Sequence, residues 1–432
     1  MDSFYFATVN IGTPPQAFNL VLDTGSSDTW VVSSACPPAQ CTHNVHKFDT
    51  SKSHTFHASD QPFHVSYGTG GINKGRLVSD TVSIANFTVA SLTFAEALDI
   101  SEHTVQPPAS GIMGLGFESL ATSGATPLWQ VLMIEKKVEE RVFSFQLKNN
   151  MREARNGQDI RPGGIFTLGM LDKSQFQGDI NWVSVPKKFG NTGIGYWAVP
   201  LDRIQVNSRS FPPGANPYAV IDTGTTLIGG PPDVVRAIYS AIPGARPSQV
   251  GEGYYEFPCN AHFTIKFGFG GRDYEITREN INLGSQGIGS MCVGAIFAQQ
   301  TGPHMPGWIV GDSFLKTVFS AFRYEPQAVG FAQLNAHGAE TLPLDRVNTQ
   351  SVSEKPGNAV STAPGGGGGG GGPRTITRGA EPTGLQGGKG LPTPSVVSTP
   401  SHMSIPARSA ADTVRVSMAL VGGALVLGAL LW

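Results

Sequence analysis

Short apolar runs separated by turn residues dominate the first 337 residues of the chain. Phe4–Ile11 and Phe18–Leu22 are joined by residues 12–15, Gly-Thr-Pro-Pro, whose glycine and prolines favour a turn. Similar runs follow at Val78–Ile84, Val89–Phe94, Val142–Leu147, Ile165–Leu168, Ala219–Ile221 and Phe263–Phe267. Runs of this length bounded by turn residues are typical of strands, so the pattern predicts a mostly β protein.

Only two segments, 127–137 and 231–242, show the spacing of an amphipathic helix. Each begins with a proline, which the first turn of a helix tolerates. The residues on one predicted face are Leu128, Val131, Leu132 and Glu135 in the first segment, and Val234, Val235, Ile238 and Ile242 in the second. We therefore expect a few short helices among the strands.

The composition changes after residue 337. Residues 338–411 are rich in Gly, Ser, Thr and Pro, contain few aromatic residues, and include an unbroken glycine run, Gly365–Gly372. Such a segment buries too little apolar surface to offset its conformational entropy. The sequence predicts a flexible stalk over residues 338–411.

The last residues, 412–432, have the order of a lipid-attachment signal. Small residues at 409–411 and a polar spacer at 412–417 precede fifteen residues, Met418–Trp432, that are almost entirely apolar. A transmembrane helix is the alternative, but it needs ~20 apolar residues. We expect a glycosylphosphatidylinositol (GPI) anchor attached at Ser409 or Ala410, which would hold the protein at the membrane or wall of the cell surface.

Charge and motif content exclude several classes of function. The 30 basic and 32 acidic residues give no basic excess to bind a phosphate backbone, so we expect no nucleic-acid partner. No P-loop and no strand followed by Gly-x-Gly-x-x-Gly occurs, and we expect no cofactor. The four cysteines allow three pairings and include no Cys-x-x-Cys, and the ten histidines lack ligand spacing. We predict no metal site.

An internal repeat carries the candidate chemistry. Residues 21–27, Val-Leu-Asp-Thr-Gly-Ser-Ser, and 220–226, Val-Ile-Asp-Thr-Gly-Thr-Thr, each place an aspartate, Asp23 or Asp222, at the end of an apolar strand. A two-fold arrangement of lobes would bring these carboxylates together. Because two close carboxylates cannot both ionise cheaply, one keeps a proton while the other acts as a base. Such a pair can activate water and protonate a carbonyl oxygen, as direct hydrolysis of an amide requires.

The residues after each aspartate suit this role. The threonine, Thr24 or Thr223, can hydrogen-bond to the opposite lobe. The glycine, Gly25 or Gly224, allows the backbone to approach closely. The next residue, Ser26 or Thr225, has a hydroxyl that can donate to the carboxylate. A single Asp-Thr-Gly is better explained as an ordinary turn after a strand. Two matched copies favour a shared site.

Further motifs around this repeat resemble those of pepsin-type aspartic peptidases, from about Phe4 to Leu334. Residues 65–70, Val-Ser-Tyr-Gly-Thr-Gly, resemble the flap that closes over the substrate, and Trp30 resembles the tryptophan that supports the flap tyrosine. Residues 308–312, Trp-Ile-Val-Gly-Asp, and 329–332, Val-Gly-Phe-Ala, resemble the closing segments of the second lobe.

The resemblance implies a bilobal fold, with lobes 1–160 and 161–337 and a cleft between them. It implies a monomeric endopeptidase in which Asp23 and Asp222 are catalytic and Tyr67, Gly68 and Thr69 belong to the flap over a peptide substrate. A neutral Thr69 offers no partner for a buried ammonium, which favours substrates with hydrophobic residues around the scissile bond.

The resemblance also implies disulfides Cys36–Cys41 and Cys259–Cys292, and therefore an oxidising, extracellular compartment. Asn86-Phe87-Thr88 is a glycosylation acceptor consistent with secretion. The stalk and tail resemble those of surface-attached fungal members. We find no signal peptide or pro-segment before Phe4, and the strand that usually opens this fold is not found there either.

Two other functions remain open from the sequence. One is a catalytically silent pepsin-fold binding protein at the cell surface, and the other is a structural surface protein whose body is a display domain. Intact Asp23, Asp222 and Tyr67 favour an active peptidase over both.

Overall fold

The computed structural model describes residues 2–41, 45–102, 104–149, 160–187, 195–285, 289–302, 305–335 and 415–422. The expected stalk, 338–411, and both expected anchor residues, Ser409 and Ala410, lie outside this part of the chain. Strands dominate the described residues, which confirms the predicted mostly β class.

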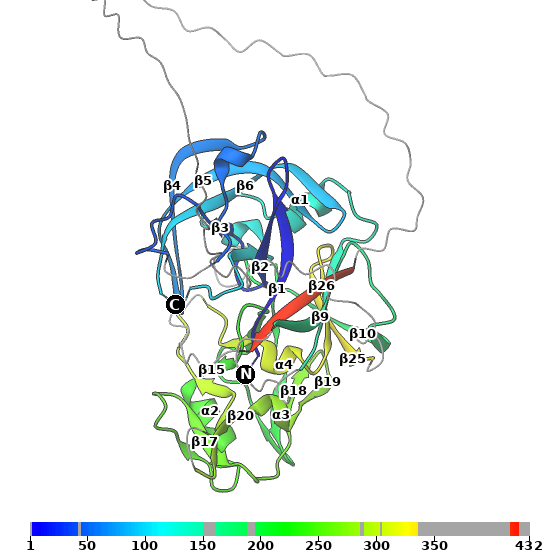
Figure 1. Cartoon of the computed structure of the whole chain (residues 1–432). Coiled ribbons are helices and arrows are strands. Elements are labelled where there is room, and N and C mark those ends of the chain that lie inside the picture. Colours follow the sequence, from blue (N-terminus) through cyan, green and yellow to red (C-terminus); the bar gives the residue numbers. More distant parts are fainter. Residues whose placement is uncertain are drawn as a thin grey trace, which may run out of the picture. The chain divides into compact units, whose positions relative to one another are not determined.

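The largest sheet contains thirteen strands, most of them from the first half of the chain (Figure 1). Its order is β10-β25-β24-β8-β9-β26-β1-β2-β7-β3-β6-β5-β4. The strands are β1 (Asp2–Ile11), β2 (Gln16–Asp23), β3 (Thr29–Val32), β4 (His57–Tyr67), β5 (Gly70–Ile84), β6 (Phe87–Ile100), β7 (Gly111–Gly114), β8 (Val142–Leu147), β9 (Ile160–Leu168), β10 (Phe176–Ser184), β24 (Phe319–Arg323), β25 (Ala328–Leu334) and β26 (Arg415–Gly422).

Three smaller sheets belong to the second half. The first, in the order β11-β14-β23-β15-β22, holds the second aspartate motif. It comprises β11 (Ala198–Pro200), β14 (Tyr218–Ile221), β23 (Trp308–Val310), β15 (Ile228–Gly230) and β22 (Ile296–Ala298). The second consists, in order, of β13 (Arg209–Phe211), β12 (Arg203–Val206), β18 (Ile265–Phe269) and β19 (Arg272–Ile276). The third consists, in order, of β16 (Arg246–Pro247), β17 (Tyr255–Pro258), β21 (Met291–Gly294) and β20 (Asn282–Ser285).

The same strand arrangement occurs in both halves and accounts for the sequence repeat. In the first half β2 pairs in parallel with β7, with Asp23 opposite Gly114, and β3 runs antiparallel to β7. In the second half β14 pairs in parallel with β23, with Ile221 opposite Val310, and β15 runs antiparallel to β23. Two related β-lobes of the pepsin-like type therefore each carry one aspartate at a strand end.

The predicted strands are found, with shifted ends in places. Val142–Leu147 matches β8, whereas the strand expected at Phe263–Phe267 is β18, which begins and ends two residues later. The prediction stopped before Gly268, but the backbone of this residue pairs with Arg203 of β12 and continues the sheet. Pairing across the sheet, rather than side-chain type, determines where this strand ends.

Both predicted helices are present as α1 (Leu128–Ile134) and α2 (Pro232–Ser240), beside the single-turn helices α3 (Arg278–Ile281) and α4 (Asp312–Leu315). The buried face of α2 is the predicted one. The face predicted for α1 is wrong in part: Trp129 and Met133 are buried with Leu128 and Leu132, while Glu135 is exposed. Trp129 turns inward because its ring packs among core aromatic rings and its indole N–H donates to the Gly116 carbonyl at 2.9 Å.

The segment Arg415–Gly422, expected in a removable signal, forms β26 (Figure 1, red). Its backbone pairs antiparallel with β1 on one side, from Phe4 opposite Val421, and with β9 on the other. β26 thus lies beside β1, whereas the sequence before Phe4 contained no strand of the kind that usually opens this fold. No helix in the described part of the chain is long and apolar enough to cross a membrane.

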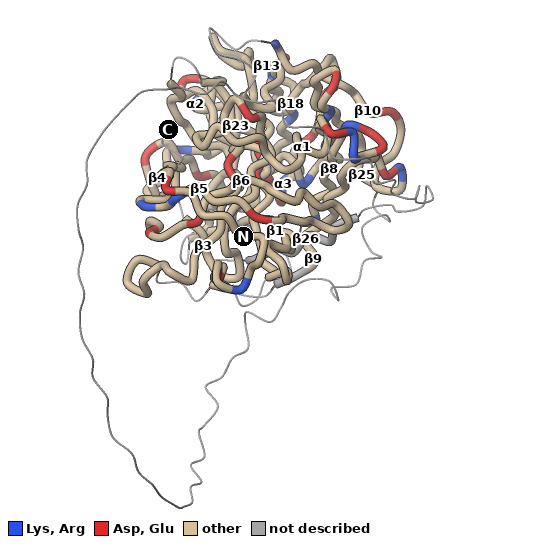
Figure 2. Tube along the Cα trace, turned by 90° about the horizontal axis from the view of Figure 1, so that it is seen from above, with Lys and Arg blue, Asp and Glu red and all other residues tan. Residues whose placement is uncertain are grey.

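Charged residues are distributed over the body rather than gathered by sign. Figure 2 shows acidic and basic positions on many of the same surface loops. Up to residue 337 the chain carries 23 basic and 27 acidic residues, which leaves it mildly acidic. Long-range attraction by net charge is therefore weak, and recognition depends on local contacts.

Candidate active site

The two aspartates occupy equivalent positions at the ends of β2 and β14. The carbonyl of Asp23 accepts a hydrogen bond from the Leu115 N–H at 2.7 Å, directly after β7. The N–H of Asp222 donates to the Val310 carbonyl at 3.0 Å, at the end of β23. The parallel strands β7 and β23 thus fix the backbone of both residues. We call Asp23 and Asp222 the aspartate pair.

Glycines allow the aspartate pair to face one another. A Cβ added to Gly25 would collide with the carboxylate of Asp222, and a Cβ added to Gly224 would collide with that of Asp23. Each glycine therefore lies directly beneath the aspartate of the other half. The position requires glycine because any side chain would push the two carboxyl groups apart.

Each carboxylate accepts the same two hydrogen bonds from its own loop. The Gly25 N–H donates to Asp23 Oδ1 at 2.8 Å, and the Ser26 hydroxyl donates to Asp23 Oδ2. In the second half the Gly224 N–H donates to Asp222 Oδ1 at 2.8 Å, and Thr225 Oγ1 donates to Asp222 Oδ2 at 2.6 Å. Local donors thus hold both oxygens of each carboxylate, which fixes the orientation of the two carboxylates.

The threonines between the aspartates and the glycines tie the two halves together. The Thr24 N–H donates to Thr223 Oγ1 at 3.1 Å, and the Thr223 N–H donates to Thr24 Oγ1 at 3.0 Å. Each hydroxyl then donates across to the other half, Thr24 to the Ile221 carbonyl and Thr223 to the Leu22 carbonyl, both at 2.7 Å. This buried network contains the hydrogen bonds to the opposite half that we expected of the two threonines.

Burial and mutual repulsion change the protonation of the aspartate pair. Burial, followed by the negative charge of Asp222, raises the pKa of Asp23 well above its ordinary value of 3.8. The bonds from Ser26 and Gly25 oppose this rise but are smaller effects. The pair therefore holds one proton at pH values where an exposed aspartate would have lost it.

The expected flap, residues 65–70, lies at the turn between β4 and β5. Tyr67, the last residue of β4, is opposite Gly70 in the antiparallel register, so Gly68 and Thr69 form the turn. The Trp30 indole N–H donates to the Tyr67 hydroxyl at 2.9 Å, as the resemblance implied. Burial, together with the nearby Asp23 charge, raises the pKa of Tyr67, so its hydroxyl stays protonated.

Two polar residues were missed in the sequence, one whose hydroxyl feels the charges of the aspartate pair and one whose charge acts on Tyr67. Burial, followed by the charges of Asp222 and Asp23, raises the pKa of Tyr196 to about 12. Asp28 is buried and accepts hydrogen bonds from the Thr122 N–H at 2.8 Å and the Ser123 N–H at 3.0 Å. Tyr196 has no counterpart in the repeat, and the partners of Asp28 are 94 and 95 residues away, so no local pattern indicated either role.

The cysteines pair as the resemblance implied, Cys36 with Cys41 and Cys259 with Cys292. Asn86 is exposed in the turn between β5 and β6, where a glycan could be attached. Among the described residues, no three His, Cys, Asp or Glu side chains gather as a metal site.

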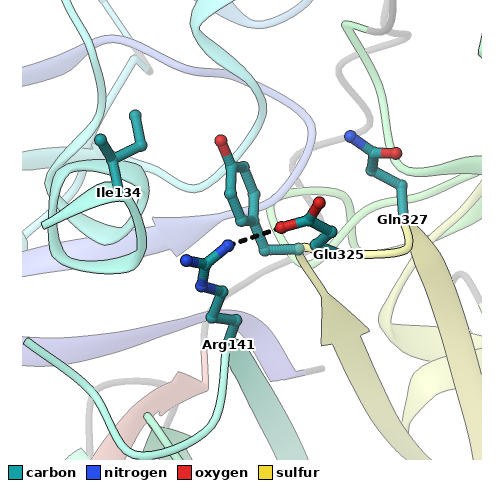
Figure 3. Close-up of a pocket in the computed structure, with 5 residues that line it drawn as sticks. Ile134, Arg141, Glu325 and Gln327 are labelled. Atoms are coloured by element: carbon teal, nitrogen blue, oxygen red, sulfur yellow. Dashed lines mark hydrogen bonds and ion pairs between the residues drawn. The ribbon is translucent and has the colours of Figure 1, made fainter. Parts of the chain in front are cut away.

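One pocket in the described structure lies apart from this site. It has a volume of about 330 Å³ and is lined by Ile134, Arg141, Tyr324, Glu325 and Gln327 (Figure 3). Arg141 Nη1 and Glu325 Oε2 form an ion pair at 2.5 Å across it. No residue of the aspartate pair or the flap lines this pocket, so it is not where the candidate chemistry occurs.

Comparison with known proteins identifies the family. The model of the eukaryotic aspartyl protease family matches residues 4–334. The chain belongs to this family. It is 41% identical to major aspartyl peptidase 1 of Cryptococcus neoformans var. grubii, over 77% of this chain and 69% of that protein. It is 34% identical to cathepsin D of Clupea harengus and to cathepsin E of Oryctolagus cuniculus, over 77% of this chain and 82% and 81% of theirs. This aspartyl protease is therefore an aspartic endopeptidase that hydrolyses peptide bonds.

Proposed function

We propose that the aspartate pair hydrolyses peptide bonds at acidic pH by activating one water molecule. The observation that carries this proposal is the matched set of donors that orients Asp23 and Asp222 while glycine lets them meet. With one shared proton, the ionised carboxylate takes a proton from water as it attacks the substrate carbonyl. The protonated carboxyl group donates to the carbonyl oxygen, and no covalent intermediate forms.

The paired substitutions Asp23→Asn and Asp222→Asn test this mechanism. Each removes the acid–base function of one carboxyl group while preserving its size, so we expect kcat to fall by roughly 10²–10⁴-fold. Asp60→Asn, at an exposed position on β4, is the matched control and should keep wild-type activity. Peptide cleavage and circular dichroism are measured together. Near-normal cleavage by either variant with a native spectrum would exclude the mechanism.

The flap supports a preference for hydrophobic residues around the scissile bond. Thr69 at the flap turn is neutral, so a lysine brought beneath it would lose water without gaining a charged partner. We expect Thr69→Asp to increase cleavage after lysine, and Thr69→Ser, which keeps the hydroxyl, to leave the profile unchanged. A wild-type enzyme that prefers dibasic sites would contradict this specificity.

The same protein is proposed to be held at the cell surface by a GPI anchor at Ser409 or Ala410. Support comes from the order of small residues, spacer and apolar tail at 409–432. Attachment there would remove β26 and leave the facing edges of β1 and β9 unpaired. Treating intact cells with phosphatidylinositol-specific phospholipase C should release active enzyme that lacks residues 412–432. Detection of Trp432 in the mature protein would rule the anchor out.

A further inference from the structure

A short segment directly after β7, Leu115–Phe117, lies against the loop that carries Asp23. The Leu115 N–H donates to the Asp23 carbonyl at 2.7 Å, and the Gly116 N–H donates to the Ser26 carbonyl at 2.8 Å. A Cβ added to Gly116 would collide with this loop at 2.6 Å, so the close contact requires glycine. We call Leu115–Phe117 the support segment, because its backbone holds the backbone of Ser26.

Two fully buried tryptophans hold the carbonyls of the support segment. The Trp197 indole N–H donates to the Leu115 carbonyl at 2.8 Å, and the Trp129 indole N–H donates to the Gly116 carbonyl at 2.9 Å. The two indole rings also pack on one another, with their centroids 5.5 Å apart. Trp129 belongs to α1 in the first half and Trp197 directly precedes β11 in the second. The support segment is therefore held from both halves of the chain.

The hydrogen bond from Trp197 acts on Ser26 through a single peptide group. The Leu115 carbonyl and the Gly116 N–H belong to the same planar peptide unit. A peptide group that accepts a hydrogen bond at its oxygen is polarised and donates more strongly from its nitrogen. The Trp197 indole therefore orients the Gly116 N–H and strengthens its bond to the Ser26 carbonyl. Trp129 fixes the next peptide unit along the chain and so limits rotation of the first.

The second half satisfies the equivalent carbonyls in a different way. There the residues after β23 form α4, and within this helical turn the Asp312 carbonyl accepts the Lys316 N–H at 2.9 Å. The support segment is not helical, so its carbonyls need donors from elsewhere in the fold. The indoles of Trp129 and Trp197 supply these donors. The two halves thus support their aspartate loops by different means.

We propose that Trp129 and Trp197 are positioning residues that keep the Ser26 hydroxyl on Asp23. This inference rests on the proposed function, in which Asp23 is one of the two catalytic carboxyl groups. The Ser26 hydroxyl donates to Asp23 Oδ2, and the place of that hydroxyl depends on where the Ser26 backbone is held. Without the indole donors the support segment can shift, the Gly116 bond to Ser26 weakens, and the hydroxyl moves with its backbone.

The groups that face Asp23 set the sign of the expected effect. Burial and the Asp222 charge raise the pKa of Asp23, and the hydrogen bond from Ser26 is the largest effect that lowers it. The hydroxyls of Tyr67 and Tyr196 stay neutral beside the pair, because burial raises the pKa of both. If the Ser26 hydroxyl moves away, the pKa of Asp23 should rise further. The pair should then keep its shared proton to a higher pH.

The test compares substitutions that keep an aromatic ring and remove the indole N–H. In Trp197→Phe we expect the alkaline limb of the kcat/KM–pH profile to move up by about half a pH unit and kcat to fall roughly 3–10-fold. Trp129→Phe should move the profile in the same direction by less. Trp308→Phe is the matched control, because this fully buried indole donates to the Pro213 carbonyl at 2.8 Å, outside the support segment. It should lower the melting temperature to a similar extent without moving the profile.

A double-mutant cycle separates positioning from a general loosening of the fold. Ser26→Ala removes the hydroxyl and should by itself move the profile to higher pH. In the Ser26→Ala background, Trp197→Phe and Trp129→Phe should each cause little further movement. All profiles are measured at pH values where the circular dichroism spectrum is native.

Three outcomes would overturn the inference. The first is a profile that moves in neither tryptophan variant, and the second is one that does not move in Ser26→Ala. The third is movements that simply add in the double variants, because the tryptophans would then act by a route other than the Ser26 hydroxyl. Absence of peptide cleavage by the wild type would instead count against the proposed function.

Discussion

Because the pKa of Asp23 is raised, we expect the free energy of unfolding to fall as pH rises. We expect the substitution Asp23→Asn to remove this pH dependence. In the unfolded chain Asp23 loses its proton near its ordinary pKa of 3.8. In the folded protein burial and the Asp222 charge keep the proton on until a higher pH. Between these values the folded state binds more protons than the unfolded state, so the free energy of unfolding falls as pH rises. Asp23→Asn has no proton to lose and escapes this penalty.

The size of the effect follows from linkage. One proton held by the folded state alone changes the free energy of unfolding by about 1.4 kcal/mol per pH unit. Because an unfolded aspartate with a pKa of 3.8 is still partly protonated at pH 4, the wild type should lose about 2.4 kcal/mol relative to Asp23→Asn between pH 4 and pH 6. Relative to the wild type, the variant should therefore gain stability as pH rises, while we expect it to lose peptidase activity.

Urea unfolding at pH 4, 5 and 6 measures this difference by tryptophan fluorescence. Trp30, Trp129, Trp197 and Trp308 are fully buried and report on both lobes. Rapid mixing keeps self-digestion of the wild type out of the signal. Asp49→Asn is the control, because hydrogen bonds from Ser51 lower the pKa of that partly exposed carboxyl group, and its difference from wild type should stay nearly constant above pH 4.

A difference between wild type and Asp23→Asn that does not change over this pH range would refute the argument. It would mean that the aspartate pair releases its proton at the same pH folded and unfolded. A difference that decreased as pH rose would have the opposite sign to the one expected. It would mean that the ionised form of Asp23 stabilises the folded protein.

Three further predictions concern individual side-chain contacts of the fold. Removing the Cys259–Cys292 disulfide, which spans 33 residues, should cost about 4 kcal/mol in urea unfolding, against about 2 for the short disulfide in the first half. Tyr67→Phe deletes the hydroxyl that accepts the indole N–H, and should lower kcat/KM by roughly 2–10-fold while the melting temperature changes little. Arg76→Ala should cost roughly 2–4 kcal/mol because the buried Glu96 carboxylate keeps the Ser33 hydroxyl as a donor but loses its opposite charge; adding Glu96→Gln should recover part of the loss, and no recovery would contradict the ion-pair argument.

From the sequence alone we predicted which residues form the candidate site and in which kind of element they lie. Apolar runs ended by turn residues predicted β2 and β14, and the repeated Asp-Thr-Gly predicted an aspartate at the end of each. These inferences succeed because strand formation and tight turns depend on neighbouring residues, which a linear pattern records. The disulfide pairing and the flap followed only from resemblance to a family.

The tertiary structure decided what depends on residues far apart in the chain. Thr24 and Thr223 bond across 199 residues, and the protonation of Asp23 depends on burial and on Asp222. The buried face of α1 was set by core packing of Trp129, against the helical spacing. Burial, register and electrostatic coupling are properties of the packed chain, and no local pattern contains them.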